Sequence, residues 1–62
     1  MNVDIFNPHF VSGYVLSSGT VTINLEAEKG SGAGLYFNST DDIRELVRAM
    51  TAWADEQDGA EK

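Results

Sequence analysis

The sequence predicts an α+β fold in which a three- or four-stranded antiparallel β-meander packs on one C-terminal amphipathic helix. Two observations support this fold class. As far as about residue 38, segments rich in β-branched and aromatic residues alternate with short turns, which is the pattern of consecutive hairpins. Beyond residue 40, apolar residues recur every three or four positions, which is the period of a helix with one buried face.

Three segments have the composition of strands, because they are rich in Val, Ile, Tyr and Phe and are bounded by turn residues. The predicted strands cover residues 10–16, 20–26 and 34–38. The second strand alternates most cleanly, with Val21, Ile23 and Leu25 on one face. Residues 1–9 are ambiguous, because a fourth short strand there would have to end at Pro8, which has no N–H to donate.

The turn between the first two strands sets their register. Ser17-Ser18-Gly19 supplies the turn, and Gly19 is free to take a positive φ. A loop of Ser18 and Gly19 would place Leu16 opposite Val21 and Tyr14 opposite Ile23, and opposed residues share a face. That face would gather Phe10, Tyr14, Leu16, Val21, Ile23 and Leu25. We expect this register; a shift of one residue would replace the aromatic residues with Val11, Gly13 and Val15.

A helix is predicted over residues 40–57. Ser39 or Thr40 can cap its N-terminus, and Ser39-Thr40-Asp41-Asp42 has the spacing of a capping box. Gly59 marks its end, so residues 58–62 are expected to fray. Its apolar stripe consists of Ile43, Leu46, Val47, Met50, Trp53 and Ala54. Packing this stripe on the apolar sheet face gives a two-layer single domain over residues 1–62.

Size and charge restrict the partners of the chain. A chain of 62 residues buries only about 60% of its unfolded surface, and without cysteine no disulfide or thiolate metal site can compensate. We therefore expect a homo-oligomer or a protein complex. Ten acidic residues against four basic ones give a net charge of −6, which disfavours nucleic acid and anionic membranes. No signal peptide or membrane-spanning run is recognisable, so we expect a cytoplasmic protein.

No pattern in the chain predicts catalysis, a cofactor or a metal site. His9, with Asp4 and Asn7 nearby in the sequence, fits a polar loop better than a metal site, which needs three or four converging ligands. The serines lie in turns without a base of their own. The glycine-rich run 30–34 opens onto a strand instead of a helix, so it is interpreted as a hairpin loop and not as a phosphate-binding loop. An enzyme is the least favoured class.

The sheet face turned away from the helix would carry more apolar residues than a solvent-exposed face normally does. This excess indicates protein binding. One helix cannot cover both faces of the sheet, and exposed apolar patches often mark interaction sites. The expected protein-binding residues are Val11, Val15, Thr22, Tyr36 and Trp53. Scattered surface apolar residues and a half-buried Trp53 are the ordinary alternatives. An open sheet edge gives a second route to association, by strand addition between chains.

The acidic residues give a rival hypothesis. A row of carboxylates could imitate nucleic-acid phosphates and inhibit a DNA- or RNA-binding protein. The residues concerned are Asp41, Asp42, Glu45, Asp55 and Glu56. Arg44 and Arg48 interrupt this row, and the pairs Asp41–Arg44 and Glu45–Arg48 have the spacing of ordinary helix support. A small structural component of a virion is a third alternative.

The segment from Phe37 to Met50 combines a strand end, the cap Ser39-Thr40-Asp41-Asp42 and an Ala/Leu-containing helix. In this it resembles short acidic proteins of actinobacteria and their bacteriophages, and the resemblance covers about residues 10–58. It implies an accessory bacteriophage or bacterial protein that binds a host factor, in the host cytoplasm if phage-encoded. The resemblance assigns a functional role to no residue of this chain. Thr51 and Trp53 replace the Ala or Leu common in such helices, which points to a specialised surface.

Overall fold

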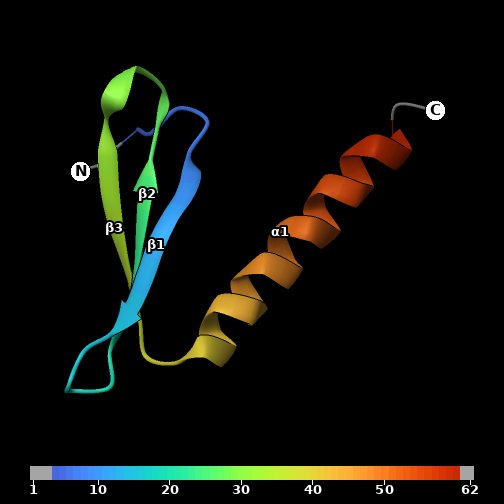
Figure 1. Ribbon diagram of the computed structural model, residues 1–62. Helices are drawn as coiled ribbons and strands as arrows, with labels where there is room; N and C mark the ends of the chain where they lie inside the picture. The colour runs from blue at the N-terminus through green and yellow to red at the C-terminus, as the bar shows by residue number, and fades with distance from the viewer. Residues whose placement is uncertain (1–3, 61–62) are drawn as a thin grey trace.

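A computed structural model describes residues 4–60 and confirms the α+β fold class (Figure 1). Three antiparallel strands lie in the order β1-β2-β3, and one helix follows them. The elements are β1 (His9–Val15), β2 (Val21–Glu26), β3 (Gly32–Phe37) and α1 (Thr40–Ala60). Residues 4–8 form no strand, so the described part of the sheet has three strands instead of four. Val3, the other candidate for a fourth strand, lies outside the described residues.

The first hairpin turns through three residues, not the expected two. The N–H of Leu16 donates to the carbonyl of Thr20, and the N–H of Gly19 donates to the carbonyl of Leu16, both at 2.9 Å. Gly19 has a φ of 95°, as expected for a glycine at this turn. A tight turn followed by a residue in the left-handed region is the usual form of a three-residue hairpin loop. The additional loop residue changes the pairing of β1 with β2.

The predicted register is therefore wrong by one residue. Val15 pairs with Val21 and Tyr14 pairs with Thr22, where Leu16–Val21 and Tyr14–Ile23 were expected. Nearer the start of β1, a bulge at Val11 shifts the pairing again, so that Phe10 lies opposite Leu25. One face is thus apolar, and we call it the apolar sheet face. It consists of Phe10, Gly13, Val15, Val21, Ile23, Leu25, Ala33, Leu35 and Phe37.

The connection from β2 to β3 is tied to the segment that precedes β1. A short 3-10 turn covers Glu28–Gly30, and Ala27 before it is buried. The N–H of Glu28 donates to the carbonyl of Phe6 at 3.1 Å, and the side-chain amide of Asn7 donates to the Glu28 carboxylate at 3.4 Å. The third strand was predicted to begin at residue 34, but β3 begins at Gly32, so it takes in two more residues of the glycine-rich run 30–34.

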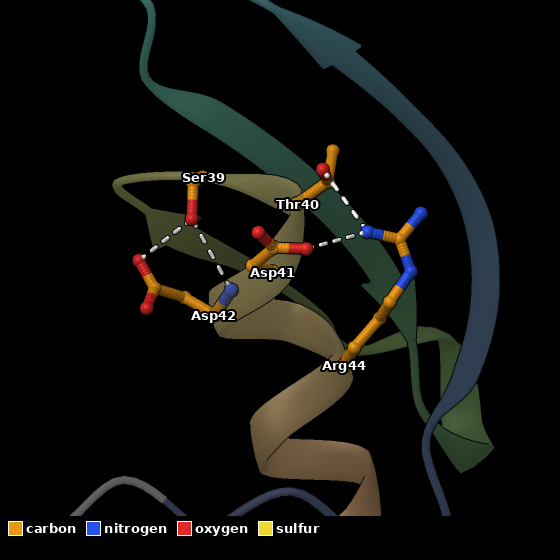
Figure 2. Close-up of polar contacts among 5 residues, drawn as sticks. All are labelled: Ser39, Thr40, Asp41, Asp42 and Arg44. Carbon is orange, nitrogen blue, oxygen red and sulfur yellow. Dashed lines mark hydrogen bonds and ion pairs between the residues drawn. The ribbon is translucent and has the colours of Figure 1, made fainter.

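The start of α1 follows the capping pattern of the sequence. The Oγ of Ser39 accepts a hydrogen bond from the backbone N–H of Asp42 at 3.3 Å and donates to the Asp42 carboxylate at 3.1 Å (Figure 2). Ser39 is thus the N-cap, and it satisfies one of the N–H groups that a helix start leaves free. Thr40, the other candidate, instead accepts from the Arg44 guanidinium at 3.3 Å.

Replacing the cap should measurably destabilise the protein. We expect Ser39→Ala to lower the free energy of unfolding by about 1 kcal/mol, because the Asp42 N–H loses its partner. Urea denaturation followed by circular dichroism measures this loss. Thr40→Ala is the matched control, since it removes a hydroxyl that binds only the exposed Arg44 side chain. A larger loss for Thr40→Ala than for Ser39→Ala would contradict this assignment.

The helix continues beyond its predicted end. It extends to Ala60, one turn past the expected end at residue 57, and includes Gly59. Gly59 does not take the positive φ of a helix-terminating glycine. A helical glycine costs only about 1 kcal/mol relative to alanine, which an otherwise regular helix can tolerate. With 21 residues, α1 is about 30 Å long, whereas strands of six or seven residues span about 20 Å.

The expected packing of α1 across the sheet is wrong. Figure 1 shows the helix leaving the end of β3 and diverging from the strands toward its C-terminus. It lies against the sheet chiefly through β3, and of the helix side chains from residue 40 to 59, those of Asp42 and Ile43 are half-buried and the others exposed. Among the described residues, the buried apolar side chains are Val21 and Ala27. The helix and the sheet therefore meet near the start of α1 and do not share an extended hydrophobic core.

Candidate protein-binding surface

The apolar stripe of α1 is an extended row of exposed apolar side chains on one element. Its side chains lie at helical spacing on one face, and the large ones beyond the second turn are more than half exposed. Leu46 is 43% exposed, Val47 55%, Met50 61% and Trp53 63%. Because an amphipathic helix in a globular protein normally buries this stripe, such values indicate a face that lacks its partner. We call Leu46, Val47, Met50 and Trp53 the helix stripe.

The apolar sheet face is fully covered only at the end next to the start of α1. Val21 is buried, whereas Ile23, Leu25, Leu35 and other members from the two later strands are half-buried. The members contributed by β1 are the most open: Phe10 is 66% and Val15 63% exposed. Ile23 leans over Gly13, since a Cβ at Gly13 would lie 3.0 Å from the Ile23 Cδ1. The glycine thus leaves room for Ile23 to cover the sheet in the absence of a larger neighbour.

The opposite sheet face carries two tyrosines on either side of a threonine. Tyr14 and Tyr36 belong to the two edge strands and both pair with Thr22 of the central strand. Both tyrosines are exposed, but Thr22 between them is only 2% exposed. Its Oγ1 has no hydrogen-bond partner within the described residues. The Tyr36 ring lies over Gly34, so its hydroxyl is held close to the sheet.

The structure does not bring the five predicted binding residues together. Thr22 and Tyr36 share the tyrosine-bearing face, but Val15 lies on the opposite face and Val11 occupies the bulge. Trp53 is on the helix. Thr22 is also too deeply buried to touch a partner. The expected grouping depended on the two-residue hairpin loop, and the three-residue loop moves Val15 to the other face.

The residues that sequence reasoning missed are those expected to form the core. Leu46, Val47 and Met50 were assigned to the interface between helix and sheet, yet all three are exposed. Phe6, which the sequence pattern did not single out, is 73% exposed. The length of the stripe gave no signal for this outcome. From Ile43 to Trp53 it spans about 15 Å, which strands of six or seven residues, about 20 Å long, could cover.

The acidic residues of the rival hypothesis do not form a free row. Asp42 is engaged with Ser39, and Asp41 binds the Arg44 guanidinium at 3.0 Å (Figure 2). Within residues 4–60 this is the sole ion pair, so the expected Glu45–Arg48 pair does not form. Glu45, Asp55 and Glu56 are exposed, but the latter two lie about three turns away from Glu45. Two of the five carboxylates thus have local structural roles.

His9 and Asp4 are exposed, and no group of three His, Asp or Glu side chains among residues 4–60 is placed to hold a metal ion. The same part of the chain encloses no pocket. None of the helices described there is long and apolar enough to cross a membrane.

Comparisons with protein-family models, curated proteins and solved structures found no match to this chain.

Proposed function

We propose that this chain is a small, non-catalytic protein-binding module that associates with itself and acts through the helix stripe. The observation that carries the proposal is the exposure of Leu46, Val47, Met50 and Trp53 along one face of α1. Aromatic residues and methionine are enriched in protein interfaces, and Trp is the residue that most often dominates their binding energy. No charged side chain interrupts the stripe.

The overall dimensions support a chain that completes its fold by association. Its accessible surface is 5258 Å², whereas a compact protein of this mass exposes about 3,900 Å². Its radius of gyration is 14.0 Å, against about 11 Å for a compact chain of this length. Burying apolar surface is the main favourable term in folding, and this chain leaves much of it in water. Association would supply the missing burial.

The setting that we propose for this activity is the cytoplasm, of the host cell if the gene belongs to a bacteriophage. The absence of cysteine is compatible with a reducing compartment, although cysteine is not required elsewhere either. The resemblance to short acidic proteins of actinobacteria and their bacteriophages supports an accessory role. In that role the helix stripe would bind a protein, either a host factor or a second copy of the chain.

Site-specific photo-crosslinking in the cells that make the protein tests the binding surface. A photoreactive amino acid at Trp53 should form covalent adducts with another polypeptide, because Trp53 lies on the helix stripe. The same amino acid at Arg48, on the other side of α1, is the control. Denaturing gels and mass spectrometry identify the adducts. Equal or weaker labelling from Trp53 than from Arg48 would exclude the helix stripe as the binding surface.

The acidic-mimic alternative makes an opposite prediction about salt. A complex held by the helix stripe should persist when the ionic strength rises from about 0.1 M to about 1 M, because apolar association is not screened. A carboxylate row that imitates phosphates would lose its partner over that range. Sedimentation of the purified complex at the two salt concentrations distinguishes binding through the helix stripe from acidic mimicry. Dissociation at high salt, together with loss of binding in Glu45→Gln, would favour the mimic.

A further inference from the structure

Two unpartnered surfaces of complementary kind occur in the same chain. The helix stripe is a narrow apolar ridge, and the apolar sheet face is a broader surface with open members such as Phe10 and Val15. A helix ridge on a sheet face is one of the few stable ways in which protein layers pack. Each surface thus has the shape and polarity that the other requires.

Within one chain, however, these surfaces do not meet. Two residues, Asn38 and Ser39, connect β3 to α1, and the Ser39 cap fixes the start of the helix. From that point α1 diverges from the strands, so Met50 and Trp53 remain exposed (Figure 1). In this conformation the helix therefore does not cover the apolar sheet face of its own chain. A second chain in the same conformation offers the missing surface without any change at the connection.

The surface that the chain exposes in excess of a compact protein is larger than one side of a standard interface. The chain exposes about 1,300 Å² more than a compact protein of its mass. A standard stable interface buries about 800 Å² on each partner. Each chain would contribute its helix stripe and its apolar sheet face, so both contacts form twice. Two-fold symmetry closes such an exchange, because no copy of either surface is left to recruit a third chain.

The charges are compatible with this arrangement. Each chain has a net charge of −6, so two chains repel unless their charged groups stay in solvent. The apolar sheet face contains no ionisable side chain, and neither does the helix stripe. Asp55 and Arg48 lie on other sides of α1, where they can remain hydrated. The contact is thus wholly apolar, and the repulsion is confined to its periphery.

Resting on the proposed function, we infer that the partner of the helix stripe is a second copy of this chain. In this dimer, α1 of each protomer lies on the apolar sheet face of the other. The structural observation behind it is the simultaneous exposure of both surfaces in a chain whose helix diverges from its own sheet. Helix exchange of this kind differs from a dimer in which two helix stripes pack on each other.

The absence of native cysteine makes a clean cross-linking test available. One preparation carries Met50→Cys, and a second preparation, with a small tag, carries Leu35→Cys, in β3 on the apolar sheet face. The two are mixed unfolded, refolded together and treated with a short bis-maleimide. We expect the cross-linked heterodimer as the main product, at a yield several-fold above that from Ala52→Cys, on the other side of α1, mixed with Leu35→Cys. Circular dichroism before cross-linking establishes that each variant is folded.

Other products would overturn the inference. Linkage mainly between two Met50→Cys chains would mean that helix stripes pack together, and the proposed function would stand. Efficient linkage within a single chain carrying both cysteines, in dilute solution, would mean that the helix folds back on its own sheet. Folded variants that form no cross-linked dimer, with a parent chain of monomer mass in light scattering, would reject self-association. Binding to a host protein through Trp53 would still be measured separately by photo-crosslinking.

Discussion

Met50→Glu should convert the associated protein to a monomer of about 6.7 kDa that is largely unfolded. Met50 lies at the centre of the helix stripe and is 61% exposed in the single chain, so association would bury it. A carboxylate at that position would lose its hydration without gaining a partner. Losses for truncating buried Met, Leu or Ile side chains are about 2–5 kcal/mol, and a buried charge adds to them. We therefore expect dimer affinity to fall at least about 100-fold, since each 1.4 kcal/mol is tenfold.

Size-exclusion chromatography with light scattering over a concentration series measures this effect, and circular dichroism reports the accompanying loss of structure. Ala52→Glu is the matched control, because it introduces the same charge into the same helix on a different, exposed side. It should leave the molar mass unchanged. If Met50→Glu retained the mass and the melting temperature of the parent protein, association through the helix stripe would be ruled out.

Thr22→Val should stabilise the protein by about 1–2 kcal/mol. Thr22 is 2% exposed, and its Oγ1 finds no hydrogen-bond partner among the described residues. Burying an unpaired hydroxyl costs about 1–3 kcal/mol in proteins, and valine has nearly the same shape without the hydroxyl. The neighbouring Tyr14 and Tyr36 can pack against the additional methyl group in place of the oxygen. Valine also favours strands, so the backbone conformation is preserved.

Urea denaturation at fixed protein concentration measures this gain, because association makes stability concentration-dependent. Thr22→Ala is the informative comparison, since it also removes the hydroxyl but leaves a small cavity beneath the two tyrosines. It should be less stable than Thr22→Val. A valine variant less stable than the parent protein would show that Oγ1 has a favourable partner that outweighs the loss of a buried hydroxyl.

Local signals in the sequence predicted the elements well. The Ser39 cap, the start of α1 and the positive φ at Gly19 each depend on a few neighbouring residues, and all three are present. The hairpin register was not predicted, because Ser17-Ser18-Gly19 suits loops of two or three residues equally well. No residue pattern around Val11 indicates the bulge that the structure has there. A shift of one residue is enough to exchange the sheet faces, which is why the predicted binding set was dispersed.

The packing of the helix could not be predicted from periodicity. An apolar stripe indicates that a face will be buried, but the pattern does not say which surface buries it. Leu46 and Met50 would have the same spacing whether they cover their own sheet or that of another chain. What decides between these arrangements is the direction in which α1 leaves β3 after Phe37. That direction is a property of three-dimensional geometry that hydrophobic spacing does not contain.

The bulge at Val11 also has a consequence for how far assembly can go. β1 is one of the two free edges of the sheet, and exposed edges are templates on which fibrils grow. The bulge breaks the regular row of backbone donors and acceptors that an incoming strand would need. The other edge, β3, contains Gly32 and Gly34, which are poor residues for extending a sheet. Both edges would therefore disfavour amyloid-like polymerisation of a chain that exposes so much apolar surface.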